Sequence, residues 1–254
     1  TAEFLEKSGM RIRFDSPSTT THSKLVIVDG RIVYLGSSNW TYSTYETTYQ
    51  SNIRLKSKKI AKICAHFFRS LWKGGNMTVR KPSDTPFSSR SVMPIFNTKD
   101  NRSYLDAVET AIEKAKSKIR IAMYRIGYYP RFENSPSNRL LERLISAEKR
   151  GVDVQVLLDR SDWSDKTNQL NTKAAWWLKL NGIEVRFDPS EVDTHAKLVL
   201  VDSRHLIIGS TNWNYYSLAE NNETDLLVAN MPDLARPFSV FFRELWEESN
   251  PLTN

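Results

Sequence analysis

Two short stretches of this chain carry the same reactive side chains in the same order. Residues 21–40 read THSKLVIVDGRIVYLGSSNW, and residues 194–213 read THAKLVLVDSRHLIIGSTNW, 173 residues later. A purely structural repeat would mainly keep its apolar positions, whereas this one keeps its polar residues. We therefore expect two half-sites that meet in one active site, and the catalytic candidates are His22, Lys24, Asn39, His195, Lys197 and Asn212.

These residue types suit cleavage of a phosphodiester bond. Without a metal, that reaction needs a nucleophile, a proton donor for the leaving oxygen and positive charge around the phosphoryl oxygens. Histidine can act as nucleophile or acid because its pKa lies near neutral, the lysines would supply the charge, and the asparagines would add neutral donors. No His, Cys, Asp or Glu cluster with metal-ligand spacing accompanies them, so we expect no metal and no other cofactor.

The pattern H-x-K-x4-D followed by G-S-x-N, present twice, resembles the phospholipase D superfamily of phosphodiesterases. The resemblance implies an α/β fold of two pseudo-symmetric α/β/α sandwich halves, with one site at their interface, and a monomer that holds both half-sites in one chain. It also implies a phosphohistidine intermediate. The N-terminal histidine of such enzymes usually attacks phosphorus, which implies that His22 is the nucleophile and His195 the acid that later activates water.

The two copies differ eleven residues after the motif asparagine, where the first has Gln50 and the second has Glu223. In the family this position usually bonds the histidine of its own motif, which implies that Gln50 pairs with His22 and Glu223 with His195. A carboxylate raises the pKa of a histidine and favours the imidazolium that a general acid requires. The difference thus also assigns acid catalysis to His195, and the same split resembles tyrosyl-DNA phosphodiesterases.

Four further motif residues are expected to be structural: Asp29, Asp202, Ser37 and Ser210. Each aspartate follows a predicted strand, where a carboxylate can stabilise a turn by accepting hydrogen bonds from backbone N–H groups.

Hydrophobic spacing predicts the elements that hold the half-sites. Short apolar runs predict paired strands at 25–28 with 32–35 and at 198–201 with 206–208. Helices predicted at 103–117, 138–150 and 173–180 alternate with strands at 119–123 and 152–158. This alternation predicts a largely parallel sheet with helices on both faces.

The extent of the repeat sets the expected domain boundaries. Residues 1–75 form the C-terminal portion of a first repeat, 76–94 form a linker rich in Gly, Pro and Ser, and 95–254 form a complete second repeat. The first copy retains only its motif strands and a strand at 12–14. We expect residues ahead of Thr1 to complete its sheet, and the chain alone to be less stable, prone to aggregation and weakly active.

Composition bears on the substrate. A net charge of +7 and a pI near 9.4 favour a polyanionic partner. Aromatic residues follow both motifs, and loops at 125–131 and 160–166 leave strand ends, where α/β sheets place ligands. We favour nucleic acid as the substrate of a nuclease or end-processing enzyme. The alternatives are a phospholipase D or phosphatidyltransferase acting on phospholipids, and a non-catalytic fragment that binds polyanions.

Little in the sequence fixes the compartment. The single cysteine, Cys64, excludes a disulfide framework, and no apolar run approaches the ~18 residues of a membrane helix. The compartment stays open, with the cytoplasm favoured.

Overall fold

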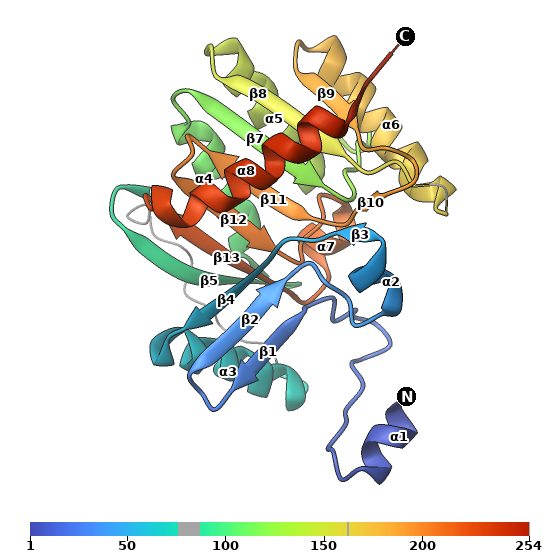
Figure 1. The fold of residues 1–254 in the computed structure, drawn as a ribbon, viewed down its shortest axis with the longest axis vertical. Coiled ribbons are helices and arrows are strands. Elements are labelled where there is room, and N and C mark those ends of the chain that lie inside the picture. Colours follow the sequence, from blue (N-terminus) through green and yellow to red (C-terminus); the bar gives the residue numbers. More distant parts are fainter. Residues whose placement is uncertain (76–86, 162, 254) are drawn as a thin grey trace.

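The computed structural model describes residues 1–75, 87–161 and 163–253. Its larger part is a nine-stranded mixed sheet with the order β14-β9-β8-β7-β11-β12-β13-β5-β6 (Figure 1). These strands are β5 (Ser91–Thr98), β6 (Asn101–Arg102), β7 (Lys118–Met123), β8 (Asp153–Leu158), β9 (Glu184–Phe187), β11 (Lys197–Val201), β12 (His205–Gly209), β13 (Glu223–Ala229) and β14 (Asn250–Pro251). The helices of this part are α4 (Ser103–Lys114), α5 (Pro136–Lys149), α6 (Asp165–Leu180), α7 (Tyr215–Ala219) and α8 (Pro232–Glu248).

The first half is smaller and packs against this sheet. It has a three-stranded sheet of β1 (Leu25–Val28), β2 (Ile32–Gly36) and β4 (Asn52–Lys56). Its helices are α1 (Ala2–Lys7), α2 (Tyr42–Glu46) and α3 (Lys58–Trp72). A two-stranded parallel sheet joins the halves, formed by β3 (Thr48–Tyr49) and β10 (Asp193–Thr194).

Alternation along the strands divides the core into two layers. On β11, Val199 and Val201 belong to the core under α4, α5 and α6. Leu198 and Leu200 point to the other face and share a core with α3 and α8. The second core also contains Val33 from β2, so the two halves are packed around one apolar interior.

The prediction of a largely parallel sheet is wrong. In the described nine-stranded sheet, only β7, β8 and β9 run parallel to one another, whereas β11, β12, β13 and β5 pair antiparallel. The reason is local. Each motif strand turns back through a three-residue loop, at residues 29–31 or 202–204, whose first two residues have φ between 52° and 57°. Such loops connect adjacent antiparallel strands.

Two other sequence predictions need correction. Residues 91–94, expected in the linker, belong to β5 and pair with β13, while residues 76–86 lie outside the described residues. The strand predicted at 12–14 is absent from the described first half. Its counterpart in the repeat lies in β9, which pairs with β8, and no strand of the described first half occupies a position equivalent to β8.

The edge of β1 is open in the part of the chain that the structure describes. The corresponding strand β11 lies between β12 and β7, whereas β1 pairs only with β2. The apolar residues beside this edge are correspondingly exposed. Phe68 on α3 is 49% exposed, while its counterpart Phe242 on α8 is 3% exposed. The described first half therefore leaves exposed an apolar side chain whose counterpart in the second half is covered.

These two phenylalanines allow a matched stability measurement. Phe242→Ala should lower the free energy of unfolding by about 3–4 kcal/mol, because it leaves a cavity in a packed core. Phe68→Ala should cost less than about 1 kcal/mol, because most of its ring already contacts water. Urea unfolding of both variants checks this. Equal losses would mean that the face of α3 is covered in solution.

Within the described residues, no helix combines the length and hydropathy that crossing a membrane requires.

Candidate active site

The histidine of each motif lies just before the first strand of that motif. A backbone hydrogen bond to the other half holds it in place. The backbone N–H of His22 donates to the carbonyl of Asn222 at 3.0 Å, and that of His195 donates to the carbonyl of Tyr49 at 2.9 Å. Tyr49 and Asn222 are themselves counterparts in the repeat. The two motifs are therefore related by a pseudo-two-fold exchange, and neither half-site is positioned without its partner.

The histidine side chains follow the same exchange, which overturns the predicted pairs. His22 Nδ1 lies 2.9 Å from the carboxylate of Glu223. His195 Nδ1 lies 3.1 Å from the carbonyl of Ser37 and 3.2 Å from the side-chain oxygen of Gln50. The expectation that each histidine pairs within its own motif is wrong, because Gln50 and Glu223 lie at the seam and face the opposite half.

These partners fix the protonation of the ring nitrogens. The carbonyl of Ser37 and the amide oxygen of Gln50 only accept hydrogen bonds, so His195 Nδ1 must carry a proton. A carboxylate likewise accepts from His22 Nδ1–H. In both rings Nε2 is then the nitrogen left to react.

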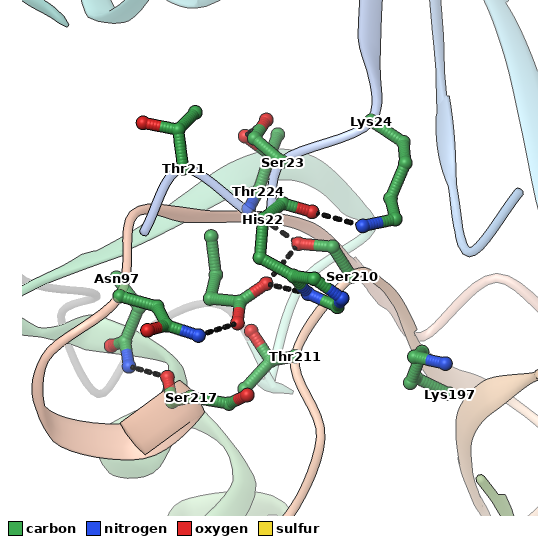
Figure 2. A network of polar contacts seen from close by, with 12 residues as sticks. Thr21, His22, Ser23, Lys24, Asn97, Lys197, Ser210, Thr211, Ser217 and Thr224 are labelled. Carbon is green, nitrogen blue, oxygen red and sulfur yellow. Dashed lines mark hydrogen bonds and ion pairs between the residues drawn. The ribbon is translucent and has the colours of Figure 1, made fainter. Parts of the chain in front are cut away.

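The motif serines orient those partners. Ser210 Oγ donates to Glu223 at 2.6 Å, and Ser37 Oγ donates to Gln50 at 2.7 Å. Figure 2 shows Ser210 beside the His22 ring. The motif glycine before each serine is needed for space. A Cβ at Gly209 would lie 2.4 Å from the carbonyl oxygen of Thr224 on the neighbouring strand, and Gly36 meets the same obstacle.

The two lysines fold back onto their own motifs. Lys24 Nζ donates to the carbonyl of His22, and Lys197 Nζ donates to that of His195 at 2.6 Å. Burial lowers the pKa of Lys24 to about 8, although Glu223 and Asp225 counteract the shift. Burial, followed by the charge of Lys24, also holds the pKa of Lys197 well below its usual range. A bound anion would therefore stabilise the charged form of both lysines.

Three other motif residues influence the pKa of His195. Its pKa lies well below the usual range, first because of burial and then because of the charges of Lys197, Lys24 and His22. A bound phosphate would cancel much of that positive charge. The free site therefore favours neutral His195, and an anionic substrate would favour its protonation.

The asparagines differ in their surroundings. Asn39 is half-buried, whereas Asn212 is buried and its side-chain oxygen has no hydrogen-bond partner among the described residues. This oxygen can only accept a hydrogen bond, so it gives no support to donation. Donation from the Asn212 side-chain nitrogen to a phosphate oxygen stays a prediction.

The aspartates of the motifs contact no part of this cluster. The carboxylate of Asp202 accepts from the backbone N–H groups of Lys116, Ser117 and Lys118 at 2.8–3.1 Å. These hydrogen bonds hold the start of β7 in place and support a structural role for Asp202. Asp29 makes no such contact within the described residues, because the first half there has no strand equivalent to β7.

Tyr124 and a buried carboxylate pair lie at the site but are not among the residues that the sequence predicts there. The Tyr124 ring lies 4.6 Å from the His195 ring, and Lys197 Nζ lies 4.8 Å from its centroid. Asp159 and Asp188 both accept from the backbone N–H of Thr194, at 3.0 and 2.7 Å. Tyr124 and Asp159 directly follow β7 and β8, so the rule that ligands bind at strand ends could have indicated them.

The described residues contain no group of three or more His, Cys, Asp or Glu that could hold a metal ion. The arrangement instead offers two imidazole groups and two ammonium groups, of which His22, Lys24 and Lys197 lie close enough to influence the pKa of His195. Chemically it can bind a phosphate anion, attack it and protonate a leaving oxygen.

The pKa of Lys24 leads to a prediction about pH. Above pH about 8 this lysine loses the charge that binds phosphate, so kcat/KM should fall by about tenfold per pH unit. Lys24→Arg should have lower activity but no alkaline decline, because a guanidinium stays charged past pH 12. A pH–rate profile of both proteins checks this. An unchanged decline in Lys24→Arg would assign the titration to another group.

Comparison with known proteins indicates the family to which this chain belongs. A family model described as "Cardiolipin synthase, PLD-like domain" matches residues 1–72 and 108–246. The mitochondrial cardiolipin hydrolase of Danio rerio is 38% identical over 117 residues, which are 45% of this chain and 49% of that protein. The 5'-3' exonuclease PLD3 of Xenopus tropicalis is 32% identical over 111 residues, which are 42% of this chain and 22% of that protein.

A solved structure shows the same fold along nearly the whole chain. The phosphatidylserine synthase of Haemophilus influenzae covers 98% of this chain, and the match covers 69% of that protein, with a TM-score of 0.71 at 13% identity. The chain spans between 38% and 62% of the length of the first five curated relatives.

Proposed function

Because this chain belongs to the phospholipase D superfamily, we propose that it carries the active site of a phosphodiesterase that cleaves nucleic acid through a phosphohistidine. The observation that carries this proposal is the exchange of partners between the two motifs. It brings both histidines and both lysines into one cluster.

In the first step, His22 Nε2 attacks phosphorus. An N–P bond forms, the bond to the leaving oxygen breaks, and that oxygen takes a proton from His195 Nε2. Attack turns the His22 ring into a cation, which the carboxylate of Glu223 neutralises while holding the ring in the reactive tautomer. Because Glu223 contacts His22 and not His195, the Gln50/Glu223 difference does not assign acid catalysis to His195 as expected from the sequence. The roles rest on the family resemblance, and we propose that the carboxylate supports the nucleophile.

In the second step, His195 Nε2 takes a proton from water, and the water oxygen attacks the phosphorus. The P–N bond then breaks and His22 is restored. Lys24 and Lys197 balance the charge on the phosphoryl oxygens in both steps. Burial and, after it, the neighbouring cations lower the pKa of His195. A bound phosphate would cancel the contribution of the cations and so favour the protonated form that the first step needs.

Nucleic acid is favoured by the surroundings of the site. The chain has a net charge of +7, and Arg102 and Arg131 line one pocket together with the exposed rings of Phe132, Tyr215 and Tyr216. This combination suits a single-stranded polyanion with stacking bases. A curated relative is a 5'-3' exonuclease.

Phospholipid is the second candidate. Relatives of this chain are mitochondrial cardiolipin hydrolases, and the similar fold in Haemophilus influenzae is a phosphatidylserine synthase. Exposed Trp40, Tyr42 and Tyr45 follow the first motif, and such rings also suit the headgroup level of a membrane.

A direct comparison of substrates tests the proposal. The chain is incubated with a labelled single-stranded oligonucleotide, with phosphatidylcholine micelles and with cardiolipin vesicles, and His22→Ala serves as the control for contaminating activity. We expect cleavage of the oligonucleotide alone. Cleavage of lipid alone would establish the second candidate, whereas binding of the oligonucleotide without any cleavage would establish a non-catalytic polyanion-binding fragment.

Chelation tests the proposed chemistry. Because the lysines supply the charge that a metal would otherwise provide, excess EDTA should leave the cleavage rate within about twofold. Loss of activity that Zn²⁺ or Mg²⁺ restores would contradict a mechanism without metal.

A further inference from the structure

A pocket of about 900 Å³ lies beside the second motif. Its walls come from β6, from α7 and from the segment between β7 and α5, and they include Arg102, Tyr129, Arg131, Phe132, Tyr215 and Tyr216. Tyr215 stands three residues after the motif Asn212, so its Cα lies within about 11 Å of the Asn212 Cα. The α7 wall of the pocket therefore lies close to the second motif.

The pocket is built from ordered backbone contacts. The N–H of Gly127 donates to the carbonyl of Trp213 at 2.7 Å, and the N–H of Trp213 donates to the carbonyl of Arg125 at 3.0 Å. A Cβ at Gly127 would lie 2.5 Å from the Tyr129 hydroxyl. Glycine at this position thus allows the Tyr129 ring to lie close to the backbone, where its hydroxyl meets the N–H of Tyr215 at 3.4 Å.

A second set of contacts holds the far end of the loop. The Asn138 side-chain amide donates to the carbonyls of Tyr129 and Phe132 at 2.9 and 3.1 Å, and its oxygen accepts from the N–H of Tyr129. The pocket is consequently preformed, and a ligand would not need to order it.

The lining indicates the chemical class of the ligand. Phe132 and Tyr216 are 69% and 68% exposed, so two large rings lie open to water. Arg102 and Arg131 are exposed and form no ion pair within the described residues, and Glu133 is the one acidic residue of the lining. No Leu, Ile, Val or Met lines the pocket. Rings with cations suit stacked bases and phosphates, whereas an acyl chain would call for aliphatic walls.

The pocket has no counterpart at the first motif. The residues equivalent to Tyr215 and Tyr216 are Tyr42 and Ser43, and Tyr42 is 81% exposed. The described first half also lacks a strand equivalent to β7, from which the other wall departs. The active site therefore has a ligand pocket beside the second motif and no equivalent pocket beside the first motif in the described residues.

We infer that this pocket binds the nucleotides on one side of the scissile phosphate of a single strand, and so gives the enzyme a direction along its substrate. The inference rests on the proposed function, because it takes nucleic acid as the substrate. Bases would stack on Phe132 and Tyr216, and the backbone phosphates would contact Arg102 and Arg131.

Extending a substrate on one side at a time tests the direction. kcat/KM for one defined bond is measured in a dinucleotide and in tetranucleotides extended by two nucleotides on the 5' or the 3' side. One extension should raise kcat/KM by about tenfold or more through stacking, and the other should change it by less than about twofold. Phe132→Ala with Tyr216→Ala should abolish the gain, while the control Tyr42→Ala should keep it. Equal gains from both extensions, no gain from either, or a gain that survives the double substitution would overturn the inference.

A binding measurement separates this inference from the proposed function. Fluorescence anisotropy of a labelled oligonucleotide on His22→Asn gives the dependence of affinity on salt without turnover. Arg102→Gln with Arg131→Gln should reduce the slope of log K against log salt by about 1.4, since each phosphate contact on a single strand contributes roughly 0.7. Lys58→Gln with Lys62→Gln on α3, an equal change of charge, should leave the slope unchanged.

The two hypotheses then fail in different ways. An oligonucleotide that binds with the expected change of slope but is never cleaved contradicts the proposed function and supports the pocket. Cleavage that is insensitive to all four pocket substitutions, with an unchanged slope, contradicts the pocket and leaves the function intact.

Discussion

His195→Asn is expected to convert this protein into one that turns over once. With a nitrophenyl phosphodiester, whose leaving group needs no proton, His22 should still attack and release about one nitrophenolate per active site. Steady turnover should then fall by about 10²–10⁴-fold, because no base remains to activate water. Stopped-flow absorbance gives the burst, and phosphate analysis of the trapped protein should place the phosphoryl group on His22.

The reciprocal substitution gives the control. His22→Asn removes the nucleophile, so both the burst and steady turnover should disappear, with a loss of at least about 10⁴-fold. A burst that survives in His22→Asn and is lost in His195→Asn would reverse the two roles.

Local elements of this fold could be predicted from the sequence. The sequence predicts β1 at its observed bounds, and β2, β11 and β12 to within a residue or two, because short apolar runs on either side of an Asp turn indicate a hairpin. Helix α6 begins at Asp165, eight residues before its predicted start. Its first turns bury polar residues, and Asn171 there donates to the carbonyls of Tyr124 and Asp159. A polar residue buried for its hydrogen bonds leaves no apolar periodicity to detect.

Contacts between the halves could not be predicted in this way. His22 and Glu223 are 201 residues apart, and no local pattern records that they meet. The repeat correctly indicated two equivalent half-sites, but equivalence alone allows partners within a motif or across the seam. The parallel pairing of β3 with β10 decides between these arrangements, because it places Tyr49 against Thr194, next to His195 and Gln50 in sequence. Tyr124 was missed for the same reason, since its contact with His195 joins two distant segments.

Because Glu223 contacts His22 across the two halves, its replacement by a neutral residue should lower activity strongly. Among residues outside the two motifs, we expect this change to have the largest effect on kcat. Glu223 is fully buried, and it is the one hydrogen-bond partner of the His22 ring in the described part of the chain. Glu223→Gln keeps the volume but removes the charge that balances the phosphorylated ring. We expect kcat to fall by about 10³–10⁴-fold, in line with the loss of a carboxylate that supports a reacting histidine.

The equivalent change on the other side should cost much less. Gln50→Ala removes one acceptor from His195 Nδ1, but the carbonyl of Ser37 remains at 3.1 Å. The ring keeps its tautomer, so activity should fall by less than about tenfold. Urea unfolding of both variants would show whether either loss reflects a folding defect.

Comparing substrates with different leaving groups tests which step of the reaction Glu223 assists. If the carboxylate assists attack, Glu223→Gln should slow the nitrophenolate burst as strongly as it slows cleavage of an oligonucleotide, because attack on phosphorus is common to both substrates. If His22 were instead the acid, the burst would keep its normal rate, since nitrophenolate leaves without a proton. A normal burst in Glu223→Gln would therefore contradict His22 as the nucleophile. A slow burst, together with a normal one in Gln50→Ala, would tie the buried carboxylate of one half to the reactive nitrogen of the other.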